Sequence, residues 1–270
     1  MEKYITGRNI SRLNIDYDSF YNNSCLKLEK VVEKEKINNC IETFIEICKL
    51  YYPNEFSKFK SDCINDQDFH SEIKCFRDRD RVSFGKLYDT LQSSLAIKSL
   101  ATSKRVKEIA SSLLNVQEAC LMIRNTIIRI DIPGDKRNLV NWHYDAYIDS
   151  QSHIPTGGLT IIIPFTGFTL ENGAPELCIG SHKTPPKQSI NKSKDENGSE
   201  IYSIPESYLR NYKKSRLIAN AGDLIAFPMT TVHKSCTNFS NQVRICALLR
   251  YYSYTNKDYL PIRETFTPII

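Results

Sequence analysis

The spacing of apolar residues along this chain changes near residue 120. Before that point apolar residues recur every three or four positions, which is typical of one face of an amphipathic helix. The pattern predicts a first helix over residues 36–52 that ends before Pro53. The charged stretch 76–81 is expected to be a linker or a helix cap. The apolar face of a second predicted helix comprises Phe84, Leu87, Tyr88, Leu91 and Leu95, and that of a third comprises Val106, Ile109, Ala110, Leu113 and Leu114.

After residue 120, short apolar runs rich in β-branched residues alternate with turn residues. Gly, Pro, Asn and Asp bound these runs, which makes them strand candidates. Helices followed by many short strands predict an α+β chain with a β-sandwich or barrel. We therefore expect a helical N-terminal region over residues 1–120, packed on a β core over residues 121–270 as one integrated domain. The predicted strands lie within residues 122–130, 159–165, 216–220, 223–228 and 243–252.

The composition narrows the class of protein. The net charge is +5, but basic and acidic residues are mixed, as in residues 27–36, so no nucleic-acid partner is expected. The chain has no run of about 18 apolar residues and no signal-peptide pattern, which predicts a cytoplasmic protein without a membrane partner. Nine cysteines include no CxxC pair, and we expect reduced core residues such as Cys40, Cys48 and Cys246. Residues 183–200 are polar and rich in Pro, Lys, Ser and Asn, which predicts a mobile loop.

Candidate metal ligands lie within the predicted β core. His143 and Asp145 are two residues apart, and residues at that spacing on a strand point to the same face. The chain has five histidines, and His233 follows a predicted strand. Two neutral imidazoles and one carboxylate leave three coordination positions open, which suits an Fe(II) oxygenase. Two of these positions can take a bidentate keto acid and the third can take O2. A surface pair or a structural histidine is the alternative.

A keto acid such as 2-oxoglutarate also needs a cation for its distal carboxylate. Arg244 lies eleven residues after His233, on the next predicted strand. Its planar guanidinium can pair with a carboxylate through two hydrogen bonds. Ser235, two residues after His233, can add a hydroxyl hydrogen bond to the same carboxylate.

The order of these motifs resembles the phytanoyl-CoA dioxygenase (PhyH-like) family of Fe(II)/2-oxoglutarate-dependent oxygenases. The resemblance covers roughly residues 120–252 and includes the segments 143–145, 172–183 and 222–238, followed by Arg244. It implies a double-stranded β-helix, the jelly-roll or cupin-like core, with Fe(II), 2-oxoglutarate and O2 as cofactors. It also implies that iron is bound by His143, Asp145 and His233, and that 2-oxoglutarate is bound by Arg244 and Ser235.

Two positions qualify the resemblance. Many family members have Gln where this chain has Tyr144, which is expected to point away from the metal and to alter a substrate contact. Related halogenases replace the ligand carboxylate by a small residue, so Asp145 disfavours halogenation.

Further candidates follow from strand alternation. Asn125 and Arg129 share one face of their strand and are candidates for contact with the keto acid or substrate, with a solvent-facing pair as the alternative. Arg250 shares the face of Arg244, an Arg-x5-Arg spacing similar to that of AlkB-like nucleic-acid dealkylases. Tyr147 shares the face of His143 and is expected to line the pocket or the core.

The remaining histidines have different expected roles. His153 lies in a polar stretch and is a loop residue or a substrate contact. His182 is expected to be structural within the turn 180–183, and His70 is expected to be solvated.

The resemblance implies an enzyme that hydroxylates a small organic molecule, with 2-oxoglutarate converted to succinate and CO2. A natural-product, sugar or lipid-type intermediate is the expected substrate class. Desaturation, epimerisation or ring formation would use the same ligands. Two alternatives stay open, namely a non-enzymatic jelly-roll binding protein and an AlkB-like nucleic-acid demethylase.

Overall fold

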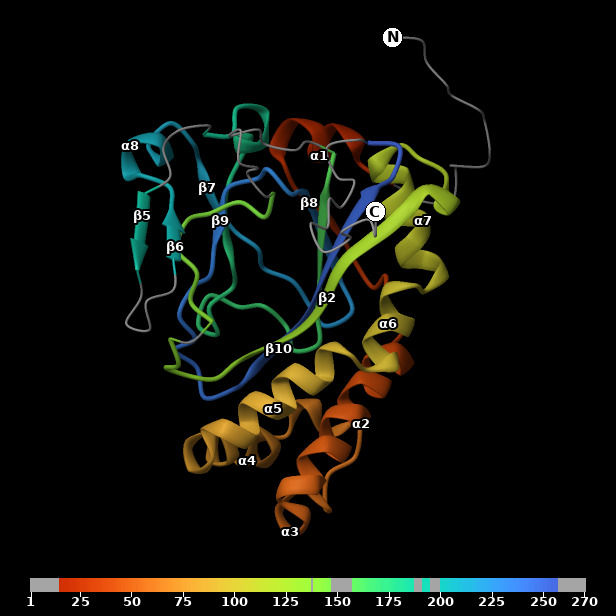
Figure 1. The fold of residues 1–270 in the computed structure, drawn as a ribbon, viewed down its shortest axis with the longest axis vertical. Coiled ribbons are helices and arrows are strands. Elements are labelled where there is room, and N and C mark those ends of the chain that lie inside the picture. The colour runs from red at the N-terminus through yellow and green to blue at the C-terminus, as the bar shows by residue number, and fades with distance from the viewer. Residues whose placement is uncertain (1–14, 137, 147–156, 187–190, 195–199, 257–270) are drawn as a thin grey trace, which may run out of the picture.

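A computed structural model describes residues 15–136, 138–146, 157–186, 191–194 and 200–256 (Figure 1). The helices precede most of the strands along the chain. They are α1 (Tyr17–Asn23), α2 (Lys34–Tyr51), α3 (Pro53–Phe56), α4 (Gln67–Arg79), α5 (Arg81–Gln92), α6 (Leu95–Ala101), α7 (Lys104–Leu114) and α8 (Glu206–Leu209). Short 3-10 turns occur at Cys63–Asn65, Glu118–Cys120 and Ser181–Lys183.

The strands form antiparallel sheets. The larger sheet has the order β1 (Leu26–Leu28), β8 (Leu224–Pro228), β3 (Leu159–Pro164), β10 (Arg244–Ser253) and β2 (Leu121–Asp131). The smaller sheet has the order β7 (Lys214–Arg216), β4 (Glu176–Cys178) and β9 (His233–Lys234). A separate pair consists of β5 (Asn191–Lys194) and β6 (Glu200–Ser203).

The five-stranded sheet has two apolar faces because its side chains alternate. One face carries Ile245, Ala247 and Leu249 of β10 and shares a buried core with helices α2, α4, α5, α6 and α7. The opposite face carries Ile162 and Cys246 and shares a second buried cluster with the three-stranded sheet. Figure 1 shows the long helices gathered beside β2 and β10. A cavity lined by Arg244, Cys246 and Arg250 of β10 lies on the face that looks toward the smaller sheet.

The helical region and the β region share one core. The largest buried cluster contains residues of the helices together with residues of β2, β3, β8 and β10. In addition, β1 lies in the first 120 residues and pairs with β8 at the edge of the five-stranded sheet. The expected α+β class is therefore present, with antiparallel sheets. The described strands do not form a closed barrel.

The helix predictions were correct where the apolar spacing was uninterrupted. The helices predicted over 36–52 and 106–114 are α2 and α7, and Asp80 caps α5 through a hydrogen bond from Ser83 N to its Oδ1 (2.9 Å). The second prediction was wrong at its end, because Leu95 begins α6 and is 85% exposed. Ser94 caps that new helix, since its Oγ accepts from Ile97 N (3.5 Å). The spacing did not indicate α4 or β1.

The polar segment 183–200 is not simply a loop. Its described part contains β5, which pairs with β6 through residues 191–194 and 200–203. Asn197 and Gly198 stand between the two strands in the sequence. A connection of three to five residues that contains Gly is compatible with a hairpin, but the polar residues of this segment give no alternating apolar pattern that would mark strands.

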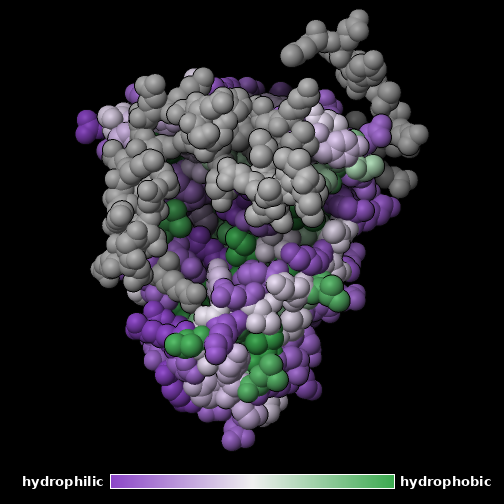
Figure 2. Space-filling model, in the orientation of Figure 1, coloured by the Kyte–Doolittle hydropathy of each residue, from purple (hydrophilic) through white to green (hydrophobic). Residues whose placement is uncertain are grey.

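Other expectations concern the cysteines and the surface. All nine cysteines are free, and Cys40, Cys48 and Cys246 are buried as predicted. Figure 2 shows apolar residues interrupted by hydrophilic ones over the helical part of the molecule. The exposed Leu50 and Val82 belong to this part. Among the described helices, none has the length and apolar character needed to cross a bilayer.

Candidate metal centre

Backbone pairing brings the two candidate histidines together. His143 and His233 form a bridge in which each backbone N–H donates to the other residue's carbonyl, at 2.9 and 2.8 Å. Residues that exchange both hydrogen bonds lie directly opposite each other in an antiparallel pair. Their rings consequently lie 4.3 Å apart between centroids. The backbone N–H of Asp145 donates to Met229 O (2.8 Å), which holds the HxD segment against the turn after β8.

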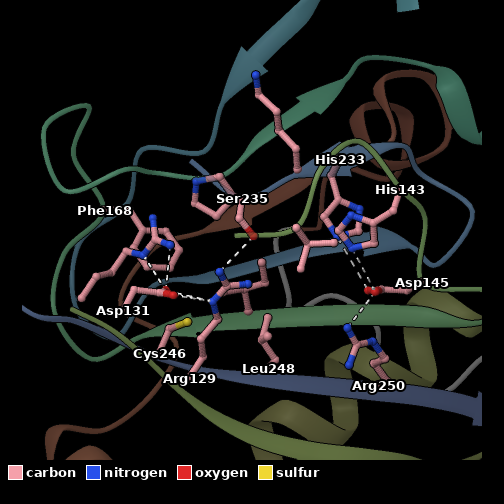
Figure 3. Close-up of a pocket in the computed structure, with 15 residues that line it drawn as sticks. Arg129, Asp131, His143, Asp145, Phe168, His233, Ser235, Cys246, Leu248 and Arg250 are labelled. Carbon is pink, nitrogen blue, oxygen red and sulfur yellow. Dashed lines mark hydrogen bonds and ion pairs between the residues drawn. The ribbon is translucent and has the colours of Figure 1, made fainter. Parts of the chain in front are cut away.

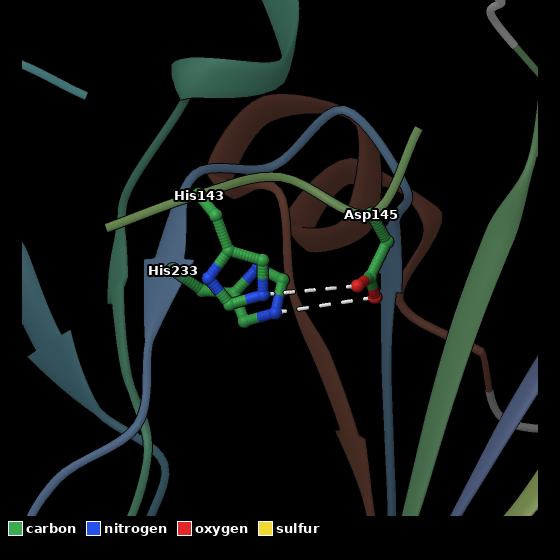
Figure 4. A group of neighbouring side chains, drawn as sticks. All are labelled: His143, Asp145 and His233. Carbon is green, nitrogen blue, oxygen red and sulfur yellow. Dashed lines mark ion pairs between the residues drawn. The ribbon is translucent and has the colours of Figure 1, made fainter. Parts of the chain in front are cut away.

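The side chains of His143, Asp145 and His233 converge on one point (Figure 4). Their candidate ligand atoms all lie within 4.8 Å of one another. The Nε2 atom of His143 is 3.8 Å from Asp145 Oδ1, and the Nε2 atom of His233 is 3.9 Å from Asp145 Oδ2. Neighbouring ligands about 2.1 Å from one metal ion lie about 3 Å apart. Small side-chain rotations therefore bring all three donors onto one ion.

Hydrogen bonds select the imidazole tautomer that metal binding requires. The Nδ1 atom of His143 is 2.7 Å from Asn141 O, and the Nδ1 atom of His233 is 3.0 Å from Thr231 O. A carbonyl oxygen can only accept, so Nδ1 carries the proton in both rings. The lone pair of each Nε2 then faces Asp145. This arrangement, in which a backbone carbonyl orients a ligand histidine, is typical of metal sites.

The surroundings also favour the ligand-ready protonation states. Burial, with the nearby His233 ring, lowers the pKa of His143 to about 3. Burial likewise lowers the pKa of His233. Burial alone would raise the pKa of Asp145, but the Arg250 guanidinium and the two imidazoles outweigh it and hold that pKa below its usual range. At neutral pH the site therefore presents two neutral imidazoles and a carboxylate, which fits non-haem Fe(II).

The three ligands lie at one end of a cavity of about 80 Å³ (Figure 3). Side chains of β10 line this cavity at every second position, namely Arg244, Cys246, Leu248 and Arg250. The same-face relation predicted for Arg244 and Arg250 is thus confirmed. The metal end holds Arg250, and the far end holds Arg244 with residues of β2.

Two arginines share one carboxylate at the far end of the cavity. Asp131 Oδ2 accepts from Arg244 Nε (3.1 Å) and Nη2 (2.7 Å). Arg129 Nε donates to both oxygens of Asp131, at 2.9 and 2.8 Å. Arg244 is only 2% exposed and also donates from Nη1 to Asn172 O (3.2 Å). Two positive charges and one negative charge leave this cluster with one surplus positive charge, which suits an anionic ligand.

Ser235 and Asn125 lie at opposite ends of the cavity, and Ser235 shares the end that contains Arg244, as expected. Ser235 Oγ lies at the far end of the cavity, where it accepts from Arg129 Nη2 (2.9 Å). Arg129 also donates to the carbonyl of Asn138. Asn125 lies at the metal end, where its Oδ1 accepts from Arg250 Nη1 (3.3 Å).

Two residues of the site, Asp131 and Thr160, were not predicted from the sequence. Asp131 lies two residues after Arg129 on β2, so the same alternation that indicated Arg129 could have identified it. Thr160 of β3 donates from Oγ1 to Asp145 Oδ2 (2.7 Å), and its neighbouring residues in the sequence carry no signal of that role.

The tentative substrate residues do not all reach the cavity. Tyr144 is buried in a separate cluster with Met229 and Tyr252, away from the metal-facing side as the strand geometry predicted. Tyr147 and His153 lie outside the described residues.

The other two histidines serve the fold. His182 joins α1 to the turn after β4, since its Nδ1 is 2.7 Å from Ser24 Oγ and its Nε2 is 3.0 Å from Tyr21 O. The solvated position expected for His70 was wrong, because the residue is 1% exposed on the packed face of α4. Its Nδ1 accepts from Val243 N (3.2 Å), next to the start of β10.

Comparison with known structures identifies the fold. The epimerase SnoN, in complex with Fe3+, alpha ketoglutarate and nogalamycin RO, superposes with a TM-score of 0.55 at 14% identity, over 88% of this chain and 82% of that one. AviO1 from Streptomyces viridochromogenes Tue57 gives a TM-score of 0.55 at 11% identity, over 89% and 94%. EvdO2 from Micromonospora carbonacea var. aurantiaca, complexed with 2-oxoglutarate, gives 0.53 at 16%, over 92% of each chain.

Comparison of the sequence with family models identifies the family. The model of phytanoyl-CoA dioxygenase (PhyH) matches residues 26–246, which include every ligand of the candidate metal centre. No curated protein matches the chain. The matched span and the convergent His143, Asp145 and His233 together show that this chain belongs to the phytanoyl-CoA dioxygenase family, as an Fe(II)/2-oxoglutarate-dependent oxygenase with these three residues as its iron-binding triad.

Proposed function

We propose that this enzyme hydroxylates a small organic molecule of the natural-product class at the iron centre. The proposal rests on one observation: the metal-binding triad and a cluster with one surplus positive charge line the same cavity. SnoN, which has the same fold, was solved with the natural product nogalamycin RO. This neighbour supports the substrate class. It is an epimerase, so the product must be identified by experiment.

The far end of the cavity is the proposed site for the distal carboxylate of 2-oxoglutarate. Arg129 and Arg244 supply N–H donors, and the hydroxyl of Ser235 is free to donate because its oxygen accepts from Arg129. Asp131 holds both guanidiniums in place before the ligand binds. A buried carboxylate without such partners would cost several kcal/mol.

The middle of the cavity suits the carbon chain of the keto acid. Ile162, Cys246 and Leu248 line it between the two charged ends. Their apolar surface excludes water from the path between the triad and the arginines. When bound, Fe(II) and 2-oxoglutarate supply the O2 activation that the protein side chains cannot perform themselves. The protein contributes the three ligands, the carboxylate site and the dry surface between them.

We also propose that the antiparallel sheets represent the double-stranded β-helix that the family implies. The support is that the five-stranded and three-stranded sheets share one buried cluster, and that His143 pairs with His233 at β9, an edge strand of the smaller sheet. Residues 1–120 and 121–270 then act as one domain, because helices and sheet share the main core.

The test is reconstitution with Fe(II) under anaerobic conditions, followed by O2 and 2-oxoglutarate, with succinate as the readout. A panel of small natural products is then analysed by mass spectrometry. Hydroxylation adds one oxygen atom, desaturation or ring formation removes two hydrogens, and epimerisation leaves the mass unchanged. Succinate formation in the wild type that is lost in His143→Ala supports the proposal. A wild type that neither binds 2-oxoglutarate nor forms succinate would favour the binding-protein alternative.

The same preparation tests the nucleic-acid alternative. A demethylase would bind DNA or RNA with an affinity that falls steeply with salt concentration. We expect no such binding, because basic and acidic residues are mixed along the chain.

A further inference from the structure

Arg250 is a charged residue at the metal end of the cavity. It lies on β10, opposite Asn125 of β2 on one side and opposite Thr160 of β3 on the other. Side chains of residues directly opposite on neighbouring strands lie side by side. Three adjacent strands therefore present a row of hydrogen-bonding groups beneath Asp145.

This row contacts both oxygens of the ligand carboxylate. Arg250 Nη2 donates to Asp145 Oδ1 (2.7 Å), and Thr160 Oγ1 donates to Asp145 Oδ2 (2.7 Å). Asn125 Oδ1 accepts from Arg250 Nη1 (3.3 Å) and so restrains the guanidinium. The Asp145 side chain is 4% exposed, which keeps water from competing for these bonds. Figure 3 shows the Arg250 guanidinium approaching Asp145 from the side opposite to the histidines.

The two hydrogen bonds are unequal in strength. Both bonds have a charged acceptor, but only the bond from Arg250 also has a charged donor, which adds the attraction between opposite charges. The bond from Arg250 to Oδ1 therefore holds its oxygen more firmly than the bond from Thr160 holds Oδ2. An aspartate that gave both oxygens to one ion would occupy a second coordination position. Only two positions would then be left for the keto acid and O2, which need three.

We propose that Arg250 is a positioning residue that retains Asp145 Oδ1, so that Asp145 binds iron through a single oxygen. Asn125 and Thr160 complete the support from the two neighbouring strands. The proposal rests on the proposed function of the triad. It gives Arg250 a role different from that of Arg244, since the two guanidiniums pair with different carboxylates at opposite ends of the cavity.

The experiment uses Co(II), which binds such sites with a visible absorption spectrum that reports its ligand geometry. Wild type, Arg250→Gln, Arg250→Lys and Thr160→Val are titrated without 2-oxoglutarate. Removal of a residue that supports a metal ligand typically lowers metal affinity 10- to 100-fold. We expect Arg250→Gln to lose about that factor and to change the Co(II) spectrum. Arg250→Lys should recover part of the affinity, and Thr160→Val should show a smaller loss because the threonine donor carries no charge.

A matched control separates this role from general effects. Arg210→Gln removes the same charge at an exposed position and should bind Co(II) as the wild type does. Circular dichroism checks that each variant is folded. If Arg250→Gln does not fold, the affinities and spectra of Arg250→Lys and Thr160→Val decide the matter.

The outcomes are distinguishable. If the wild type binds no Co(II), or if His143→Ala binds it equally well, the proposed function itself fails. If the wild type binds Co(II) at the triad and the folded Arg250 and Thr160 variants match its affinity and spectrum, only the role of Arg250 is overturned.

Discussion

The two ends of the cavity have opposite electrostatic requirements. The metal end must offer lone pairs, so its imidazoles are held neutral by burial and its carboxylate is held charged by Arg250. The far end must offer N–H donors, yet it contains Asp131, which neutralises one of its two arginines. One surplus charge is left there. A site that binds an anion therefore does not need every arginine to be unpaired, because the shared carboxylate fixes the geometry of the N–H donors.

The two ends also differ in their place in the fold. The histidines lie on short edge elements, one of them in the two-residue strand β9 and the other in an isolated bridge. At the far end, Arg129 and Asp131 lie on the long strand β2, and Arg244 lies on its neighbour β10. We expect substitution of either histidine to affect chemistry with little loss of stability. Substitutions at the far end should affect both.

The largest effect is expected at the metal end. His143→Ala removes one of three ligands, and Fe(II)-dependent succinate formation should fall on the order of 1000-fold or more, which corresponds to about 4 kcal/mol. Thermal unfolding of the metal-free variant should resemble that of the wild type, since His143 is only partly buried. Full activity in this variant would show that iron is held elsewhere.

Arg244→Ala tests the dual role of the far end. It should weaken 2-oxoglutarate binding by about 2–5 kcal/mol, as when one partner of a buried charge pair is truncated. It should also lower the free energy of unfolding, because Asp131 loses two of its hydrogen bonds. Arg244→Lys should raise the KM for 2-oxoglutarate less. Calorimetric titration checks the affinity, and wild-type affinity in Arg244→Ala would assign the carboxylate to Arg129.

Asp131→Asn should separate stability from binding. Loss of the shared charge leaves two buried guanidiniums unbalanced, and the free energy of unfolding should fall by about 3 kcal/mol. The surplus positive charge at the site rises at the same time. Addition of 2-oxoglutarate with a divalent metal should therefore raise the melting temperature of Asp131→Asn more than that of the wild type. An equal or smaller shift would mean that Asp131 does not compete with the ligand.

The pH dependence of the metal-free protein reports the metal end. The pKa values of His143 and His233 are lowered by burial in the folded state, so below pH 6.5 the unfolded chain binds more protons. Stability should fall as the pH drops from 6.5 to 5.5, by at most about 1.4 kcal/mol for each histidine. Asp145 acts at lower pH, where loss of its charge removes stability. Chemical denaturation at the two pH values measures the slope, which His143→Gln should reduce.

The smallest effect is expected for Ser235→Ala. It removes one hydroxyl beside Arg129, and a single hydrogen bond contributes about 1 kcal/mol. The affinity for 2-oxoglutarate should drop about 5-fold, with Co(II) binding unchanged. A loss as large as that of Arg244→Ala would show that the serine orients Arg129 rather than contacting the ligand.

Local spacing was sufficient to predict several parts of this molecule. Helices α2 and α7 follow from uninterrupted apolar periodicity. His143 and Asp145 share a face because alternation along an extended chain is a local property. Local spacing failed for β1, whose three residues are too short for any period, and for His70, a polar residue on a packed helix face.

The sequence by itself determined the ligand types, their order and the face on which each strand residue lies, because these depend on local geometry and on motif order. Only the tertiary structure decided which charges meet. Asp131 joins Arg244, and Arg250 joins Asp145, through contacts more than 100 residues apart in the sequence. Such pairs depend on which strands are neighbours and on their register, and a one-residue shift of β10 would turn both arginines away from the cavity.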